Sequence, residues 1–231
     1  MATYVDNIGV PPRTLSPEEQ NAILKVTGER GNGVRHCLLP FFVLWGTLLA
    51  MARPVRIDFP GARHHVMNRG LRQGPVFIDD WCCQEFLALL PEAVERFEIV
   101  VHGYALMPNH FHLLLESPHG NLSRAMAYVS ATFSRRLNTR FHWDGSIFRG
   151  RFHNRVVIAP DHWHHLLAYI HLNPLKARLV MSLEQSRWTS HAAYAKELSC
   201  PDWLQTDFIL SELGGVEGYR QNQGNGVRPR Q

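Results

Sequence analysis

The sequence predicts an α+β fold, in which an antiparallel sheet carries helices packed on it. Three observations predict it. Residues 61–70 have the pattern of a strand that ends in a turn, residues 81–97 have apolar side chains at helical spacing, and two apolar strand segments, 99–106 and 109–115, follow with only a short junction between them. A strand, a helix and two adjacent strands are typical of an antiparallel sheet with helices on it.

The first helix has a clear start and one apolar face. Asp79 and Asp80 precede it, and acidic residues complement the positive end of a helix dipole. Apolar side chains then recur at intervals of three and four, which predicts one buried face. They are Trp81, Phe86, Leu89, Leu90, Val94 and Phe97.

Further elements follow in the second half of the chain. Residues 121–140 show a buried stripe at helical spacing, and 145–158 have the pattern of a loop and a strand. A closing helix is expected over 161–172, with Asp161 as its N-cap. Aromatic anchors beyond residue 180 predict a small helical extension over 181–220, and the Gly, Asn, Gln and Arg of 221–231 predict a disordered tail.

The composition is that of a globular protein: 45% of the residues are hydrophobic and 19% are charged. The formal net charge is only +4, but basic residues cluster. Between residues 121 and 156 there are seven arginines and one acidic residue, Asp144. Such a cluster favours a polyanionic partner, although many basic stretches are only solvated faces. The arginines are Arg124, Arg135, Arg136, Arg140, Arg149, Arg151 and Arg155.

Two histidines stand one residue apart on the strand over 109–115. Side chains on a strand alternate between faces, so His110 and His112 project to the same side and can bind one metal ion. The alternative is a pair of histidines that are hydrogen-bonded at a sheet edge. Tyr169 and Asn173 are four residues apart, which places them on one helical face if the helix continues up to Pro174. An amide oxygen from Asn173 would help the site accept Mg²⁺ or Mn²⁺.

Six motifs in order give the chain a resemblance to the IS200-like single-tyrosine transposases, which carry a His-hydrophobic-His motif and act on single-stranded DNA. The chain is most similar to the subfamily associated with repetitive extragenic palindromes (REP). The match covers residues 51–180 well and 181–220 loosely. The motifs are Met51-Ala52-Arg53-Pro54-Val55-Arg56-Ile57, Pro60-Gly61-Ala62, His65-Val66-Met67-Asn68-Arg69-Gly70, Met107-Pro108-Asn109-His110-Phe111-His112-Leu113-Leu114, Phe148-Arg149-Gly150-Arg151-Phe152 and Tyr169-Ile170-His171-Leu172-Asn173-Pro174.

This resemblance implies a ferredoxin-like core and a metal-dependent strand transfer. It makes Tyr169 the nucleophile, which would form a 5′-phosphotyrosine and release a 3′-hydroxyl, and makes His110, His112 and Asn173 the ligands of Mg²⁺ or Mn²⁺. Composition and spacing alone do not choose Tyr169 over Tyr104 or Tyr128. Two further residues near the motifs, Glu116 and His171, are candidates for proton handling, although most such residues are only solvated.

The expected DNA contacts come from two groups of residues. Arginines interleaved with aromatic residues can hold phosphates and stack bases, and here they are Arg135, Arg136, Arg149, Arg151 and Arg155, interleaved with Phe133, Phe141, Trp143, Phe148 and Phe152. The resemblance adds polar positions near the start of the domain that would help to recognise a short guide sequence beside a hairpin. These are Arg53, Arg56, Asn68 and Arg69.

Residues 1–50 do not resemble the start of a compact domain. The apolar segment 37–50 is shorter than a spanning helix needs and contains Pro40. Since the resemblance begins at Met51, we expect the native domain to start there, with a membrane anchor in 1–50 as the alternative. The four cysteines show no Cys-x-x-Cys spacing, and a reduced cytoplasm is the simplest compartment.

Two other functions remain open from the sequence. Gly103, His110, His112, Glu116 and Gly120 loosely resemble the first motif of a cupin-like metal enzyme, although the spacings differ. The chain could instead be a catalytically silent protein that binds palindromic DNA. Both a monomer and a homodimer are compatible with the sequence.

Overall fold

The computed structural model describes residues 56–157 and 160–227. Our expectations for residues 1–50, for a start at Met51 and for Arg53 lie outside the described residues. No helix in the described ranges is long and apolar enough to cross a bilayer.

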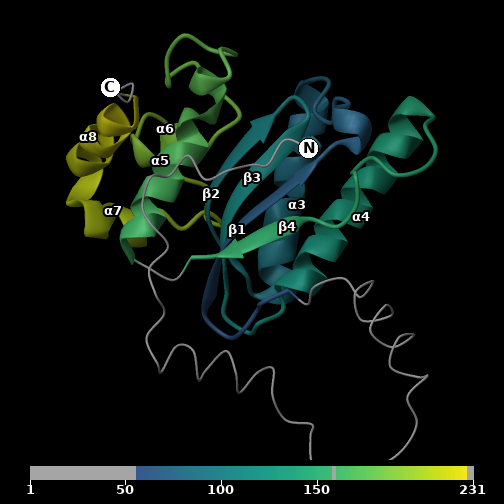
Figure 1. Cartoon of the computed structure of the whole chain (residues 1–231), viewed down its shortest axis with the longest axis horizontal. Helices are drawn as coiled ribbons and strands as arrows, with labels where there is room; N and C mark the ends of the chain where they lie inside the picture. The colour runs from purple at the N-terminus through teal and green to yellow at the C-terminus, as the bar shows by residue number, and fades with distance from the viewer. Residues whose placement is uncertain (1–55, 158–159, 228–231) are drawn as a thin grey trace, which may run out of the picture. The chain divides into compact units, whose positions relative to one another are not determined.

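A sheet of four antiparallel strands forms the centre of the fold, in the order β2-β3-β1-β4. Helix α3 (Asp80–Phe97) connects β1 to β2, and α4 (Leu122–Phe141) connects β3 to β4 (Figure 1). This β-α-β-β-α-β order is ferredoxin-like and confirms the predicted fold class. The strands are β1 (Ala62–Arg69), β2 (Val100–Met107), β3 (His110–Ser117) and β4 (His153–Val156). The open sheet and its helices make the cupin-like alternative wrong, because that fold is a β-barrel.

A two-residue turn fixes the register of the central strands. Pro108 and Asn109 join β2 to β3, so that Met107 pairs with His110 and the register continues to the pair of Gly103 and Leu114, beyond which a bulge shifts it. The carbonyl oxygen of Pro108 accepts hydrogen bonds from the backbone N–H groups of Val76 and Phe77 at 2.8 and 3.0 Å. These hydrogen bonds hold the turn in place. The turn thereby fixes which residues of β3 face each side of the sheet.

One face of the sheet packs against α3 and α4. Phe111, Leu113 and Leu115 of β3 are fully buried there, together with Phe86 of α3 and Phe133 of α4. Asp79, one of the two acidic residues expected at the start of this helix, caps α3 by accepting a hydrogen bond from the Cys82 backbone N–H at 3.0 Å.

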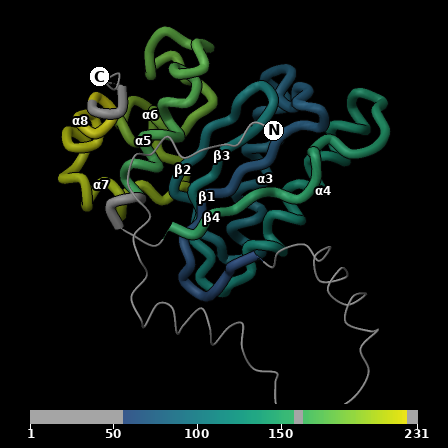
Figure 2. The backbone as a smooth tube through the Cα atoms, viewed as in Figure 1, coloured from purple at the N-terminus to yellow at the C-terminus, as the bar shows by residue number. Residues whose placement is uncertain are grey.

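The other face carries α5 (Pro160–Lys176) and the C-terminal helices. Leu114 of β3 packs with Leu167 and Ile170 of α5 in a second core. Helix α5 approaches β2 so closely that a Cβ atom on Gly103 would lie 2.7 Å from Leu167 Cδ1. A side chain at position 103 would force the Leu167 methyl group to move. Figures 1 and 2 show α5 and the helices after it gathered away from α3 and α4.

The C-terminal part differs in detail from the prediction. Helix α5 does not end before Pro174 but continues to Lys176. The predicted helical extension is confirmed, with α6 (His191–Tyr194), α7 (Asp207–Leu213) and α8 (Gly215–Val227). We expected disorder from residue 221, whereas α8 runs to Val227 because it packs on α5 and buries Gln223.

A buried histidine makes the stability of this fold depend on pH. His102 of β2 lies with its ring centroid 5.1 Å from that of Trp163, and burial lowers its pKa to about 4 despite the nearby Glu116 carboxylate. In the unfolded chain the pKa returns to about 6.5. As the pH falls below that value, the unfolded state takes up a proton that the native state does not, and the native state loses stability.

We therefore expect His102 alone to lower the free energy of unfolding by about 2 kcal/mol between pH 7.5 and pH 5. The variant His102→Gln should lose this part of the pH dependence, while the contributions of other groups stay. Urea unfolding of both proteins at the two pH values measures the difference. An identical loss of stability in both proteins would contradict the assignment.

Candidate active site on the α5 face of the sheet

Three histidines meet on the sheet face that α5 covers. The β1–β3 register pairs Met67 with His112 and Arg69 with His110, so these four side chains share one face. The ring centroids of His110 and His112 lie 5.0 Å apart, with the rings nearly perpendicular. His65 of β1 is on the same face, and its ring stacks on that of His112 at 5.1 Å.

His65 is the residue that our sequence analysis missed as part of the site. Its Nε2 lies 2.9 Å from Nδ1 of His112, and the two residues are only 8% and 1% exposed. A bond to Nδ1 leaves Nε2 of His112 as the nitrogen that could bind a metal. Alternation along the strand predicts which face of the sheet His65 lies on. It does not predict that His65 meets His112, because that requires the pairing of β1 with β3.

Asn109 orients His110 in a similar way. The amide nitrogen of Asn109 donates to the Gln73 carbonyl oxygen at 3.1 Å, so its amide oxygen is the atom that lies 2.7 Å from His110 Nδ1. That oxygen can only accept, so we assign the proton to Nδ1 of His110. Nε2 of His110 then carries the free lone pair.

Burial keeps these rings uncharged. It lowers the pKa of His65 and of His110 to about 4 each, and the positive charges of Arg155 and Arg69, respectively, act in the same direction. Burial also holds the pKa of His112 well below its usual value, with smaller effects from His65, His110 and Arg69. All three histidines are therefore neutral at neutral pH, which is the state that binds metal ions.

Tyr169 projects from α5 onto this group. Its half-buried ring lies edge-on to His65 and His112, with centroid distances of 6.3 and 5.8 Å, and Lys176 Nζ lies 5.5 Å from the ring centroid. One turn later, the amide nitrogen of Asn173 donates to the Tyr169 carbonyl oxygen at 3.2 Å. The amide oxygen of Asn173 is then the atom that could act as a ligand.

The other candidate tyrosines lie elsewhere. Tyr104 is buried beside Trp203 in the core on the α3 and α4 side, and Tyr128 of α4 donates a hydrogen bond to Glu92. The structure thus brings Tyr169, and neither of these two, next to the histidines.

The two residues weighed for proton handling have other partners. Glu116 pairs with Arg63 at 3.1 Å, and His171 is fully buried between Tyr219 and Ser190.

Some of the predicted DNA-binding residues border the site. Arg69 lies beside His110, and Arg155 of β4 pairs in register with His65. The exposed Arg149 and Arg151 are in the segment before β4, and the Arg149 N–H donates to the Arg69 carbonyl oxygen at 2.9 Å. These residues put positive charge along the β4 side of the histidines.

Two other predicted contacts have structural roles. Asn68 is 2% exposed and donates to the Gly150 carbonyl oxygen at 3.2 Å, so it holds the segment that carries Arg149 and Arg151. The Arg56 guanidinium donates to the Phe152 carbonyl oxygen and lies 3.8 Å from the centroid of that ring.

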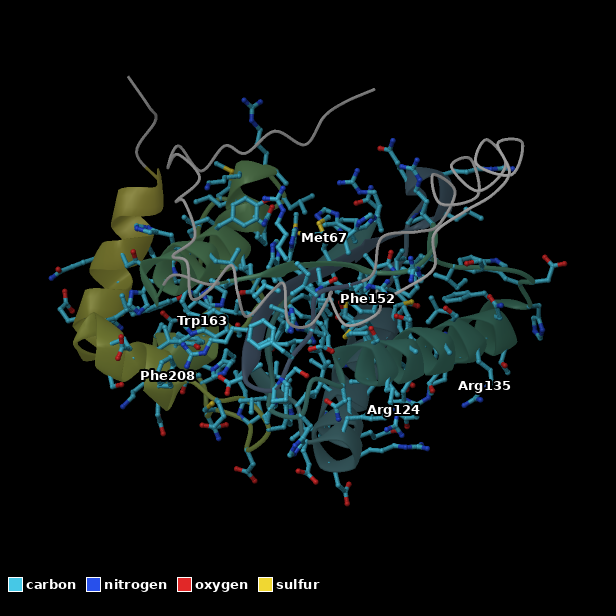
Figure 3. All side chains as sticks on the ribbon, turned by 60° about the horizontal axis from the view of Figure 1, so that its bottom comes forward. Met67, Arg124, Arg135, Phe152, Trp163 and Phe208 are labelled. Carbon is cyan, nitrogen blue, oxygen red and sulfur yellow. The ribbon has the colours of Figure 1, made fainter. Side chains whose placement is uncertain are left out.

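The α4 arginines do not join the site. Arg136 forms ion pairs with Glu85 and Glu92 of α3 at 3.0 and 3.1 Å, and Arg135 is exposed on the same helix. Because α4 packs on the opposite face of the sheet from α5, both lie away from the histidines. Figure 3 shows Arg124 and Arg135 on α4, apart from Trp163 of α5.

The fold and the site define a ferredoxin-like domain with three histidines on the sheet face that α5 covers and a tyrosine supplied by that helix. Residues 60–157 match the family described as "Transposase IS200 like". This match covers less than half of the chain, and the matched segment contains the three histidines.

Several solved structures are similar to this chain. One is a REP-associated tyrosine transposase bound to a REP hairpin, with 17% identity and a TM-score of 0.55 over 67% of this chain and 92% of that chain. A putative transposase from Deinococcus radiodurans R1 has 16% identity and a TM-score of 0.37, over 52% and 95%. The tRNA(His) guanylyltransferase of Saccharomyces cerevisiae has 9% identity and a TM-score of 0.40, over 80% and 86%. No curated protein shows a significant match.

Proposed function

We propose that the protein is a metal-dependent transposase that nicks and rejoins single-stranded, hairpin-forming palindromes through Tyr169. The observation that carries the proposal is the position of the Tyr169 ring, edge-on to two neutral histidines, on the face that also holds His110. The solved REP-associated transposase is bound to a REP hairpin, which supports a hairpin as substrate here. We place the catalytic domain in residues 51–180.

The chemistry assigned to Tyr169 is a phosphoryl transfer. The hydroxyl oxygen attacks the scissile phosphorus, the new bond forms a 5′-phosphotyrosine, and the bond from phosphorus to the 3′-oxygen breaks. The tyrosine loses its proton to solvent and the 3′-oxygen gains one. Because the covalent link preserves the energy of the broken bond, a second 3′-hydroxyl can reverse the step and rejoin the strand.

The residues present fit a divalent cation. Nε2 of His110, Nε2 of His112 and the amide oxygen of Asn173 would hold Mg²⁺ or Mn²⁺, with the remaining positions left to water and phosphate oxygens. When bound, the cation polarises the scissile phosphate and stabilises the charge that develops on it. This help matters because only about one tyrosine in a thousand is ionised at neutral pH.

The direct test is a covalent adduct. We expect a labelled single-stranded hairpin from the flanks of the gene, incubated with Mg²⁺ or Mn²⁺, to give a protein–DNA band on a denaturing gel. Tyr169→Phe should abolish the band, because phenylalanine lacks the attacking oxygen. Tyr128→Phe is the matched control and should keep it. Hairpin binding by the wild type without any adduct would instead support a catalytically silent DNA-binding protein.

A second prediction concerns His65 as a positioning residue. His65→Ala should weaken Mn²⁺ binding about 10- to 100-fold, because His112 loses the partner that fixes its ring and tautomer. His65→Gln restores an acceptor oxygen and should recover part of the affinity. Calorimetric titration of the DNA-free protein gives the affinities, with the exposed His119→Ala as control. Equal affinities in wild type and His65→Ala would exclude this role.

A third prediction separates the two faces of the sheet. If DNA passes over the α5 face, Arg69→Gln should weaken hairpin binding and reduce the slope of log affinity against log salt concentration by about 1. Arg135→Ala on α4 should leave that slope unchanged. Fluorescence anisotropy over a series of salt concentrations measures both. A reduced slope for Arg135→Ala and an unchanged slope for Arg69→Gln would instead indicate that DNA binds along α4.

A further inference from the structure

A second group of metal-ligand side chains lies in the C-terminal part, away from the sheet histidines. Glu184 precedes α6, His191 is its first residue and Glu197 follows it. One ligand atom from each of the three lies within 4.8 Å of the other two. Both glutamates are exposed, whereas His191 is only 4% exposed. A buried imidazole therefore lies close to two solvent-facing carboxylates.

The two ring nitrogens of His191 have different surroundings. Nδ1 lies 2.6 Å from the Tyr219 hydroxyl oxygen. Nε2 is buried and has no hydrogen-bond partner among the described residues. A buried polar atom without a partner is uncommon and calls for a ligand or a bound ion.

We assign the proton of His191 to Nδ1 from a buried chain of hydrogen bonds. The Ser190 hydroxyl accepts from the Tyr104 N–H at 3.0 Å and can donate to the Tyr104 carbonyl at 3.4 Å, which leaves it free to accept from His171 Nε2 at 2.6 Å. His171 Nδ1 is then an acceptor for the Tyr219 hydroxyl at 2.7 Å, and Tyr219 accepts from His191 Nδ1.

In this arrangement Nε2 of His191 carries a lone pair, and a ring nitrogen of His191 lies within 4.8 Å of a carboxylate oxygen of Glu184 and of Glu197. Lone pairs and carboxylates repel one another unless a positive charge lies between them. Burial lowers the pKa of His191, although Glu197 and Glu184 act in the other direction, so a proton on the ring is disfavoured. A metal cation would accept the imidazole lone pair and balance the charges of both carboxylates.

We propose that Glu184, His191 and Glu197 form a second divalent-cation site, distinct from the His110 and His112 site. One imidazole nitrogen and two carboxylate oxygens, with water as the fourth ligand, suit Zn²⁺ in tetrahedral geometry. The cation joins the segment before α6 to the segment after it. It also fixes the proton of His191 on Nδ1 and so orders the chain of bonds through Tyr219 to His171.

This site has a structural link to the proposed nucleophile. His171 is on α5, two residues after Tyr169, and is held from both sides by Tyr219 and Ser190. An ordered chain of bonds fixes the rotation of α5 about its axis. The second site therefore stabilises the helix that presents Tyr169, without contacting DNA.

The experiment uses the full chain carrying His110→Ala and His112→Ala, which removes the first site. Calorimetric titration with ZnCl₂ should give one bound zinc per chain, and zinc should raise the melting temperature. Adding Glu184→Gln and Glu197→Gln should weaken zinc binding at least tenfold and abolish the rise. Both positions are exposed, so folding should persist, and circular dichroism checks it. Glu212→Gln with Glu217→Gln, which are exposed on α7 and α8, is the matched control and should bind zinc normally.

The outcomes show whether Nε2 of His191 binds a cation or a proton. Nitrogen NMR of the histidine rings should show the Nε2 signal of His191 shifting when zinc is added, while Nδ1 stays protonated. Absence of zinc binding in the His110→Ala, His112→Ala chain would overturn the proposal, as would zinc binding that survives loss of both glutamates. A proton found on Nε2 of His191 in the presence of zinc would do the same. None of these readouts depends on transposition.

Discussion

The antiparallel register between β1 and β3 is the constraint on which the site depends. It pairs Met67 with His112 and Arg69 with His110, and it brings His65 within 2.9 Å of His112. Since side chains alternate along a strand, a slip of one residue would turn His65 into the α3 and α4 core and bring His64 to the α5 face. The buried Val66 on the other face of β1 opposes such a slip, because it would leave the core formed with α3 and α4. The hydrophobic core and the histidine site therefore specify the same register.

The second requirement is the close approach of α5 to the sheet. Tyr169 reaches the histidines because α5 lies directly on β2, where Gly103 has no side chain to hold Leu167 away. The buried bonds from His171 to Ser190 and Tyr219 join the same helix to β2, α6 and α8. The C-terminal extension is thus part of what positions Tyr169, although it lies outside the span that matches the transposase family.

The sequence predicted those features that depend on local periodicity. The strands, α3, α4 and the shared face of His110 and His112 follow from alternation and helical spacing. The succession of elements predicted an antiparallel sheet with helices on it, and the resemblance supplied the ferredoxin-like order. Tyr169 could be chosen only by resemblance, because its approach to the histidines is a tertiary contact. His65 was missed for the same reason: it is 47 residues from His112, and no local pattern reports that pairing. We predicted the end of α5 too early. The residue before a proline disfavours the helical conformation, but packing of α5 on β2 outweighs this preference at Asn173.

The structure also divides a charge cluster that the sequence presents as one. Seven arginines fall between residues 121 and 156, yet those of α4 lie on one side of the sheet, while Arg149, Arg151 and Arg155 accompany β4 and its preceding segment. The histidines are buried and neutral, so the positive charge near them comes from Arg69 and Arg155. A polyanion is therefore attracted to the rim of the site, while the histidines at its centre stay uncharged. For the proposed function, this separation would let one face hold a phosphate backbone without protonating the histidines that we assign to the metal ion.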